Sequence, residues 1–178
     1  MRKPRIFLVV GLCLFLSVAC TTREEAEQNG NDYKSVTVGG ITLQWKADTL
    51  GFLNVKVSAP TTGWVAAGFD PTAGMRDANI IIGYVSGDEV FVRDDYGTTQ
   101  NAHESDSAGG GENNISEQSG TEIGGTTEIS FKIPLDSGDA RDRPLVVGTT
   151  YSIILAYGQD DSFDSYHGTT RAATSIEL

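Results

Sequence analysis

The chain has 178 residues, of which 39% are hydrophobic, and its formal net charge at pH 7 is −11. This length suits one domain of ordinary size that can bury a sizeable core. The acidic balance excludes the basic surface that nucleic-acid binding requires, so we expect no nucleic-acid partner.

The N-terminus has the pattern of a secretory signal. A basic stretch precedes an apolar run over residues 6–18, which is too short to span a bilayer as a permanent helix. The run ends in Leu16-Ser17-Val18-Ala19-Cys20, which resembles the lipobox of bacterial lipoproteins, although Ser17 stands where leucine is usual. We expect residues 1–19 to be a lipoprotein signal peptide and Cys20 to carry the lipid, such as palmitate. An ordinary signal peptide or an uncleaved signal anchor is the alternative.

Cleavage before Cys20 has consequences for charge, redox chemistry and location. It removes three of the 13 basic residues and no acidic residue, so the net charge falls from −11 to −14. It also removes Cys13, which leaves no pair of cysteines for a disulfide or a zinc site. The protein is then a cell-envelope lipoprotein on the periplasmic or surface side, attached to the membrane through its lipid. Thr21, in place of aspartate, favours the outer membrane over the inner one.

The mature chain divides into a tether and one domain. Residues 20–32 are polar and without apolar periodicity, which predicts a flexible tether behind the lipidated cysteine. Residues 33–178 consist of short apolar segments separated by Gly, Asp, Asn and Pro, which predicts an all-β fold, an immunoglobulin-like antiparallel β-sandwich of eight to ten strands. Residues 97–113 are polar and rich in Gly and Ser, and we expect a long loop there.

The expected strands differ in their apolar pattern. Residues 41–47 and 53–59 alternate between apolar and polar side chains, which is typical of half-buried strands. Residues 63–69 and 79–85 are almost continuously apolar, which is typical of strands covered on both faces. The remaining expected strands cover residues 89–93, a weak segment near 115, 127–133, 151–157 and 175–178.

Few residues in this chain are suited to catalysis. There is no Gly-x-Ser-x-Gly elbow, and no cysteine is left to act as a nucleophile, so we expect no enzyme activity. Calcium could bind to acidic turns, although Asp-rich turns are more often only turns. The two candidate groups are Asp136, Asp139 and Asp142, and Asp160, Asp161 and Asp164.

One methionine and one histidine stand out. After cleavage Met75 is the only methionine, and it lies in a loop directly after an apolar segment. His167 lies in a turn after another apolar segment. A thioether and an imidazole form a known axial pair for haem iron. By themselves the two residues are equally compatible with ordinary packing and an ordinary surface histidine.

Several motifs together resemble the DOMON domain family from about Tyr33 to the C-terminus. A Gly-Trp strand, a Gly-Met loop and an Ala-Asn-apolar-Gly-Tyr strand follow one another, and a Pro-Leu-Asp turn, an apolar strand and a closing His and Arg segment come later. In this sequence they are Gly63–Phe69, Gly74-Met75, 78–84, 133–139, 151–158 and 166–171. Asn79 replaces the aspartate common in the family, and Ala172 replaces a glycine.

The resemblance implies a fold and a ligand. DOMON domains are immunoglobulin-like sandwiches that bind haem b or sugars, and they include the cytochrome domain of cellobiose dehydrogenase. In the haem-binding branch the methionine of the Gly-Met loop and the C-terminal histidine are the axial ligands, and these positions correspond to Met75 and His167. Because both residues follow inner strands, we expect a sandwich to bring their loops together at one end.

Further residues could support the haem. Arg171 could pair with a haem propionate, or form an ordinary surface ion pair. The aromatic residues that could line an apolar haem slot, or belong to the ordinary core, are Trp64, Phe69, Tyr84 and Tyr166.

Two functions remain open at this point. The first is a membrane-anchored, extracytoplasmic b-type cytochrome, which binds haem b through Met75 and His167 and exchanges single electrons with a redox partner protein. The alternative is a non-redox DOMON module that binds a sugar or another small ligand through an aromatic residue such as Trp45 or Trp64.

Overall fold

The computed structural model describes residues 32–178. The expected signal peptide (residues 1–19), the lipidated Cys20 and nearly all of the expected tether lie outside the described residues. Residues 32–178 form eleven strands and contain no helix, so they also contain none that could cross a membrane. The predicted all-β class is therefore confirmed.

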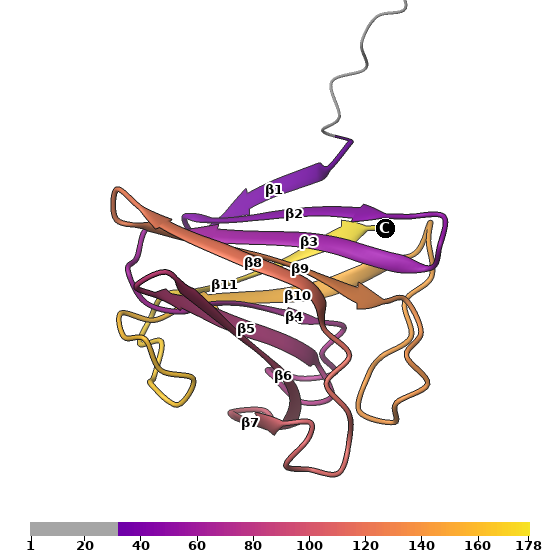
Figure 1. Cartoon of the computed structure of the whole chain (residues 1–178). Helices are drawn as coiled ribbons and strands as arrows, with labels where there is room; N and C mark the ends of the chain where they lie inside the picture. The colour runs from indigo at the N-terminus through magenta and orange to yellow at the C-terminus, as the bar shows by residue number, and fades with distance from the viewer. Residues whose placement is uncertain (1–31) are drawn as a thin grey trace, which may run out of the picture. The chain divides into compact units, whose positions relative to one another are not determined.

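The strands pair into two antiparallel sheets that stack as a sandwich (Figure 1). One sheet has five strands in the order β1-β2-β3-β9-β8, and the other has six in the order β11-β10-β4-β5-β6-β7. The strands are β1 (Lys34–Val38), β2 (Ile41–Ala47), β3 (Phe52–Ala59), β4 (Val65–Phe69), β5 (Asn79–Ser86), β6 (Glu89–Thr99), β7 (Ala102–Ser105), β8 (Ser116–Ile123), β9 (Thr126–Pro134), β10 (Thr150–Tyr157) and β11 (Arg171–Glu177).

The apolar pattern of each segment agrees with the side of the sheet that is buried. In β3 and β9 every second residue is buried, because only one face of the five-stranded sheet packs on the core. All five residues of β4 and six of the eight residues of β5 are buried, as the continuous apolar runs predicted. Both faces of the six-stranded sheet are therefore covered around these two central strands.

The region around residue 100 differs from the sequence-based expectation. The expected loop over residues 97–113 contains the end of β6 and all of β7, which pair with a register shift between Gly97 and Thr99. β1 was not expected either. β1 and β7 are both edge strands: β1 packs only Val36 and Val38 against the core, and β7 has polar, largely exposed residues, so backbone pairing contributes much of what holds them in place. The total of eleven strands exceeds the expected eight to ten.

The main core lies between the two sheets and is built from aliphatic side chains. Ile129 on β9 is fully buried there, as are Val57 on β3 and Ile81 on β5. A second, smaller apolar cluster contains Trp64 and Ile82, whose side chains point to the opposite face of the six-stranded sheet. The outer face of the six-stranded sheet therefore also carries buried apolar side chains.

Truncation of Ile129 tests the assignment of the main core. We expect Ile129→Ala to lower the free energy of unfolding by about 2–5 kcal/mol, because the deletion leaves a cavity between the sheets. The control is Ile123→Ala on β8, where the side chain is 74% exposed and the change should stay within about 0.5 kcal/mol. Chemical denaturation followed by tryptophan fluorescence measures both. Equal effects of the two substitutions would contradict the assignment.

Candidate functional site

A cavity of about 670 Å³ opens on the outer face of the six-stranded sheet. Its floor consists of two rows of side chains that run across β11, β10, β4 and β5, as the register of the paired strands shows. All eight floor residues line the cavity, and all but one are apolar. One row is Arg171, Ala156, Ala66 and Ile82, and the other is Ala173, Ile154, Gly68 and Ile80.

The flat floor follows from the alternation of side chains along β4. Val65, Ala67 and Phe69 point into the core between the sheets, so Ala66 and Gly68 point to the outer face. The floor also contains the small residues Ala156 on β10 and Ala173 on β11, whereas Ile154 on β10 and the isoleucines of β5 are large. The result is a shallow apolar depression of a size typical of small-molecule and cofactor sites.

Met75 and His167 line this cavity from opposite ends of the sheet. Met75 lies in the loop after β4, next to the last pair of β4 and β5, Phe69 and Asn79. His167 lies in the loop after β10, whose last residue, Tyr157, pairs with the first residue of β4. The expectation that both loops lie at one end of the sandwich is therefore wrong, because β4 and β10 are antiparallel. The two side chains share one cavity by reaching over its floor from two sides.

The Met75 loop is held tightly against the β6–β7 hairpin. The backbone N–H of Met75 donates to the carbonyl of Gln100 at 3.1 Å, and the carbonyl of Met75 accepts from Ala78 at 3.1 Å. Gly74 has a φ of 61°, and a Cβ there would overlap the carbonyl oxygen of Gln100. A Cβ on Gly97 would overlap the carbonyl oxygen of Met75. The position of Met75 thus depends on two glycines and two backbone hydrogen bonds.

The His167 side chain is oriented so that one ring nitrogen is free. Its Nδ1 lies 3.0 Å from the carbonyl oxygen of Gly168, while Nε2 has no hydrogen-bond partner among residues 32–178. Metal-binding histidines commonly donate their other N–H to a carbonyl group in this way. Thr170 fixes the turn, because its hydroxyl and its N–H both donate to the carbonyl of His167.

Aromatic residues hold the histidine loop in place. The Trp64 Nε1 donates to the hydroxyl of Ser165 at 2.8 Å, and the Trp64 ring meets the His167 ring edge-on at 6.3 Å between centroids. The Tyr166 ring lies 4.7 Å from the His167 ring but is 77% exposed. Trp64 and Tyr166 therefore both line the cavity. Trp64 is buried there, and Tyr166 is largely exposed.

Arg171 lies at the edge of the floor, at the first position of β11. Among the described residues that line the cavity, it is the only lysine or arginine. It also forms no ion pair with the described acidic residues, so its guanidinium is available to an anionic ligand group. The propionate role that the sequence suggested for Arg171 stays a prediction.

His103 also lines the cavity, which sequence reasoning left without a role. Its Nδ1 lies 2.6 Å from Oδ2 of Asp95, which is fully buried and which also accepts two hydrogen bonds from Arg93. Burial acts to raise the pKa of Asp95, but hydrogen bonds from His103 and Arg93 outweigh it and lower that pKa. The sequence contains one sign of this part of the site, the adjacent pair Asp94-Asp95 inside a strand. Because adjacent residues of a strand face opposite sides of the sheet, one of these two carboxylates has to face the side of the cavity.

Three aromatic residues named from the sequence lie elsewhere. Phe69 is 1% exposed in the core between the sheets, because it shares the inward side of β4 with Val65 and Ala67. Tyr84 stacks on Phe91 at 5.0 Å between ring centroids and does not line the cavity. Trp45, suggested as a sugar platform, is 6% exposed in the core, and its Nε1 donates to the carbonyl of Glu177. None of the three contributes to the cavity.

Comparison with known proteins identifies the family. The sequence pattern of the DOMON domain matches residues 37–158, more than half of the chain. The chain belongs to the DOMON domain family. The matched range contains Met75 and ends before His167.

Solved structures with a similar fold include two cytochrome domains. The cytochrome b domain of pyranose dehydrogenase from Coprinopsis cinerea has a TM-score of 0.60 and 11% identity, over 81% of this chain and 80% of that one. The cytochrome domain of Myriococcum thermophilum cellobiose dehydrogenase has a TM-score of 0.57 and 14% identity, over 82% of this chain and 81% of that one. At these identities the likeness establishes a shared fold.

A curated relative of the DOMON domain is DBH-like monooxygenase protein 1 from Mus musculus. It is 28% identical over 141 residues, which are 76% of this chain and 22% of the mouse protein. The chain thus corresponds to about a fifth of the length of that relative, and the match concerns one module of it.

The DOMON domain also contains a buried acidic cluster, which we define as Asp94, Asp106 and Asp142. Asp94 and Asp106 are 2% and 1% exposed. Burial, with a smaller contribution from neighbouring carboxylates, raises the pKa of Asp94 to about 8 and that of Asp106 to about 7. Burial likewise raises the pKa of Asp142. The cluster brings one member of the expected acidic turn, Asp142, together with two residues that no sequence motif connected to it.

These raised pKa values predict how stability depends on pH. Between pH 5 and pH 8 the folded protein retains carboxyl protons that the unfolded chain, with a pKa near 3.8, has released. The free energy of unfolding should therefore decrease as the pH rises through this range, by more than about 1 kcal/mol. Urea denaturation at several pH values, in buffer with a chelator of divalent cations, measures it.

The variant Asp106→Asn isolates the contribution of the cluster, because it removes one titrating carboxyl and retains the shape of the side chain. We expect a shallower pH dependence for this variant than for the wild type. Identical pH dependence of the two proteins would contradict the assignment.

Proposed function

We propose that this protein binds haem b in the outer cavity of its DOMON domain and transfers single electrons. The observation that supports this best is the cavity itself, which brings Met75, His167 and Arg171 together over a flat apolar floor. A methionine thioether and a histidine imidazole can bind iron, and an arginine guanidinium can bind a propionate carboxylate. The similarity in fold to two cytochrome domains supports the same proposal.

The residues of the cavity suit the parts of a haem group. The Met75 thioether and the free Nε2 of His167 would hold the iron, each from a loop fixed by backbone hydrogen bonds. The floor of Ala, Gly and Ile residues would contact the macrocycle and exclude water from it. Arg171, at the exposed edge, would bind a propionate carboxylate.

Haem held between a methionine and a histidine supplies one-electron exchange at a raised reduction potential. With both side chains engaged, the cavity offers no place for a substrate at the metal, which favours electron transfer over catalysis. His103, held by the buried Asp95, faces the same cavity and keeps a polar group next to the apolar floor.

The burial of both tryptophans argues against the sugar-binding alternative. Trp45 is 6% exposed and Trp64 is 4% exposed, and the Nε1 of each is engaged in a hydrogen bond within the protein. Sugar sites usually present an exposed aromatic face, and neither ring does so.

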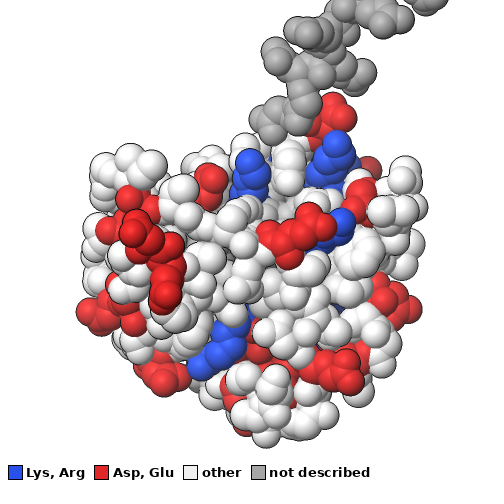
Figure 2. All heavy atoms as spheres, viewed as in Figure 1, with Lys and Arg blue, Asp and Glu red and all other residues white. Residues whose placement is uncertain are grey.

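The surface charge suits a cationic redox partner. Acidic side chains are spread over the face seen in Figure 2, with few lysines and arginines between them. With a net charge of −11, such a surface raises the association rate of a positively charged electron donor or acceptor. We further propose that lipid on Cys20 anchors the domain to a membrane of the cell envelope, which would keep it close to membrane-bound partners.

Absorption spectra of the full-length protein, produced with a supply of haem, test the cofactor. We expect sharp low-spin b-type bands that change reversibly on reduction. Met75→Leu and His167→Gln should each abolish the low-spin spectrum, because each removes one axial ligand. His103→Gln is the matched control, since it changes a histidine of the same cavity and should leave the low-spin bands in place.

Two results would contradict the proposal. A folded protein that remains colourless in the presence of haem would rule out the cofactor. Loss of the low-spin bands in His103→Gln, with retention in His167→Gln, would assign the histidine ligand to β7 instead.

Metabolic labelling with a radioactive fatty acid tests the anchor. The wild-type protein should incorporate the label, and Cys20→Ser should lose it completely, because the thiol is the site of lipidation. Cys13→Ser is the matched control, since this cysteine lies in the apolar run that cleavage removes. Label that persists in Cys20→Ser would rule out the proposed anchor.

A further inference from the structure

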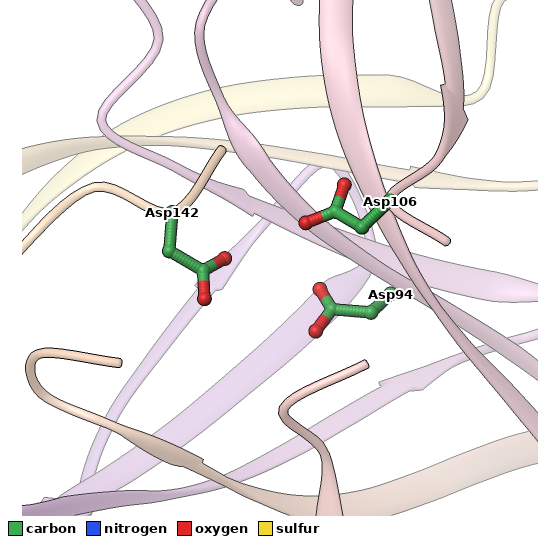
Figure 3. Close-up of side chains that lie close together, drawn as sticks. All are labelled: Asp94, Asp106 and Asp142. Atoms are coloured by element: carbon green, nitrogen blue, oxygen red, sulfur yellow. The ribbon is translucent and has the colours of Figure 1, made fainter. Parts of the chain in front are cut away.

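The acidic cluster has the geometry of a cation site. One oxygen from each of Asp94, Asp106 and Asp142 can be chosen so that all three lie within 4.8 Å of one another. Figure 3 shows the three carboxyl groups pointing toward a common centre. Oxygens that share a calcium ion at about 2.4 Å lie up to about 4.8 Å apart, so the spacing suits an ion of that size.

Several buried oxygens at the cluster have no hydrogen-bond partner within residues 32–178. These are both carboxylate oxygens of Asp106, one of Asp94, and the amide oxygens of Asn79 and Asn114. Buried polar atoms are almost always paired in folded proteins, so a group of unpaired acceptors in one place requires a partner that is not a protein donor. These oxygens are more acceptors than one water molecule, with two O–H groups, can satisfy, whereas one cation binds several oxygen ligands at once.

Asn79 points into the cluster and is independent evidence for a ligand. It is 6% exposed, and its Nδ2 donates to Oδ1 of Asp142 at 2.6 Å. Its Oδ1 is unpartnered. Rotation of the amide by 180° would exchange the two atoms and present the oxygen to the same position as the carboxylates.

We propose that Asp94, Asp106 and Asp142, with the amide oxygens of Asn79 and Asn114, bind a calcium ion. An all-oxygen set with three carboxylates suits a hard cation and does not suit zinc or copper, which favour nitrogen and sulfur ligands. Calcium is favoured over magnesium because the ligands come from strands and loops of unequal rigidity, which fits a flexible coordination shell better than a strict octahedron.

The charges around the cluster leave it in need of a cation. Two nearby arginines are engaged elsewhere: Arg141 pairs with Glu104 at 2.9 Å and Arg143 pairs with Asp70 at 2.9 Å. Carboxylates packed this closely repel one another when they are ionised, which is a penalty in the absence of a counter-ion. A divalent ion removes this penalty and lets all three ionise.

The backbone prepares the cluster for an ion. The N–H of Asp106 donates to the carbonyl of Asp94 at 3.0 Å, and the N–H of Asn114 donates to Oδ2 of Asp94 at 2.9 Å. These bonds attach both ends of the segment 106–114 to Asp94 in the middle of β6. Asp142 comes from the connection between β9 and β10, so an ion would fasten two long loops to β5 and β6.

The proposed ion lies on the opposite face of the sheet from the outer cavity. Asn79 and Asp94 each precede a residue that faces the cavity side, namely Ile80, which lines it, and Asp95, which holds His103. Calcium would therefore stabilise the strands that carry the cavity without contacting its ligand. For that reason the inference does not depend on haem binding.

Thermal unfolding of the full-length protein, purified in detergent and freed of metal with EGTA, tests the proposal. At pH 7.5 we expect CaCl2 in about 100-fold excess over its dissociation constant to raise Tm by roughly 5–10 °C. The same concentration of MgCl2 should give a clearly smaller rise. Isothermal titration with CaCl2 should show one site per chain.

Three variants separate a ligand role from a merely structural one. Asp106→Asn and Asp142→Asn should lose most of the calcium-dependent rise in Tm. In EGTA the same variants should be as stable as the wild type or more stable, because each removes a buried carboxylate from a repulsive cluster. Asp88→Asn, an equal charge change at the exposed turn between β5 and β6, is the control and should retain the full rise.

The opposite outcomes would overturn the proposal. Equal Tm values in EGTA and in CaCl2 for the wild type would mean that protons alone neutralise the cluster. A full calcium-dependent rise in both Asp106→Asn and Asp142→Asn would place the ion elsewhere. If one of these variants fails to fold, titration of Asn79→Ala, which keeps all three carboxylates, should still show weakened calcium binding.

Discussion

The antiparallel register of β10, β4 and β5 is the constraint on which the candidate site depends. It aligns Ala66 and Gly68 of β4 with Ala156 and Ile154 of β10 in two rows and places the isoleucines of β5 at one side of the floor. The same register sends the loop after β4 and the loop after β10 to opposite ends of the sheet. Met75 and His167 therefore reach one cavity from two sides, and both are available to the haem that we propose for it.

The rigidity of the site comes from elements outside it. The β6–β7 hairpin holds the Met75 loop through Gln100, and Trp64 holds the His167 loop through Ser165. On the face of the sheet opposite the cavity, β6 carries Asp94 of the acidic cluster, and β5 carries Asn79, which donates to Asp142. β5 thus contributes residues both to the cavity floor and to the surroundings of the cluster.

Local patterns of the sequence predicted most of the fold, and residues distant in sequence explain what they missed. Alternation identified β3 and β9 because one face of each is buried, but it could not identify β7, whose edge position needs no apolar face. Parity along β4 would have separated Phe69 from Trp64, since residues five positions apart in a strand face opposite sides. The acidic cluster joins Asp106 and Asp142, which only the folded chain brings together.

The identity of the atoms around the iron tests the central proposal most directly. X-ray absorption spectroscopy at the iron edge of the haem-loaded, full-length protein distinguishes sulfur from nitrogen neighbours. A methionine and histidine pair predicts one sulfur neighbour in the wild type, absent in Met75→Leu, with nitrogen at the remaining positions. A wild-type iron surrounded by nitrogen alone would contradict the assignment of Met75, and His103, the other histidine of the cavity, would then be the candidate for the second ligand.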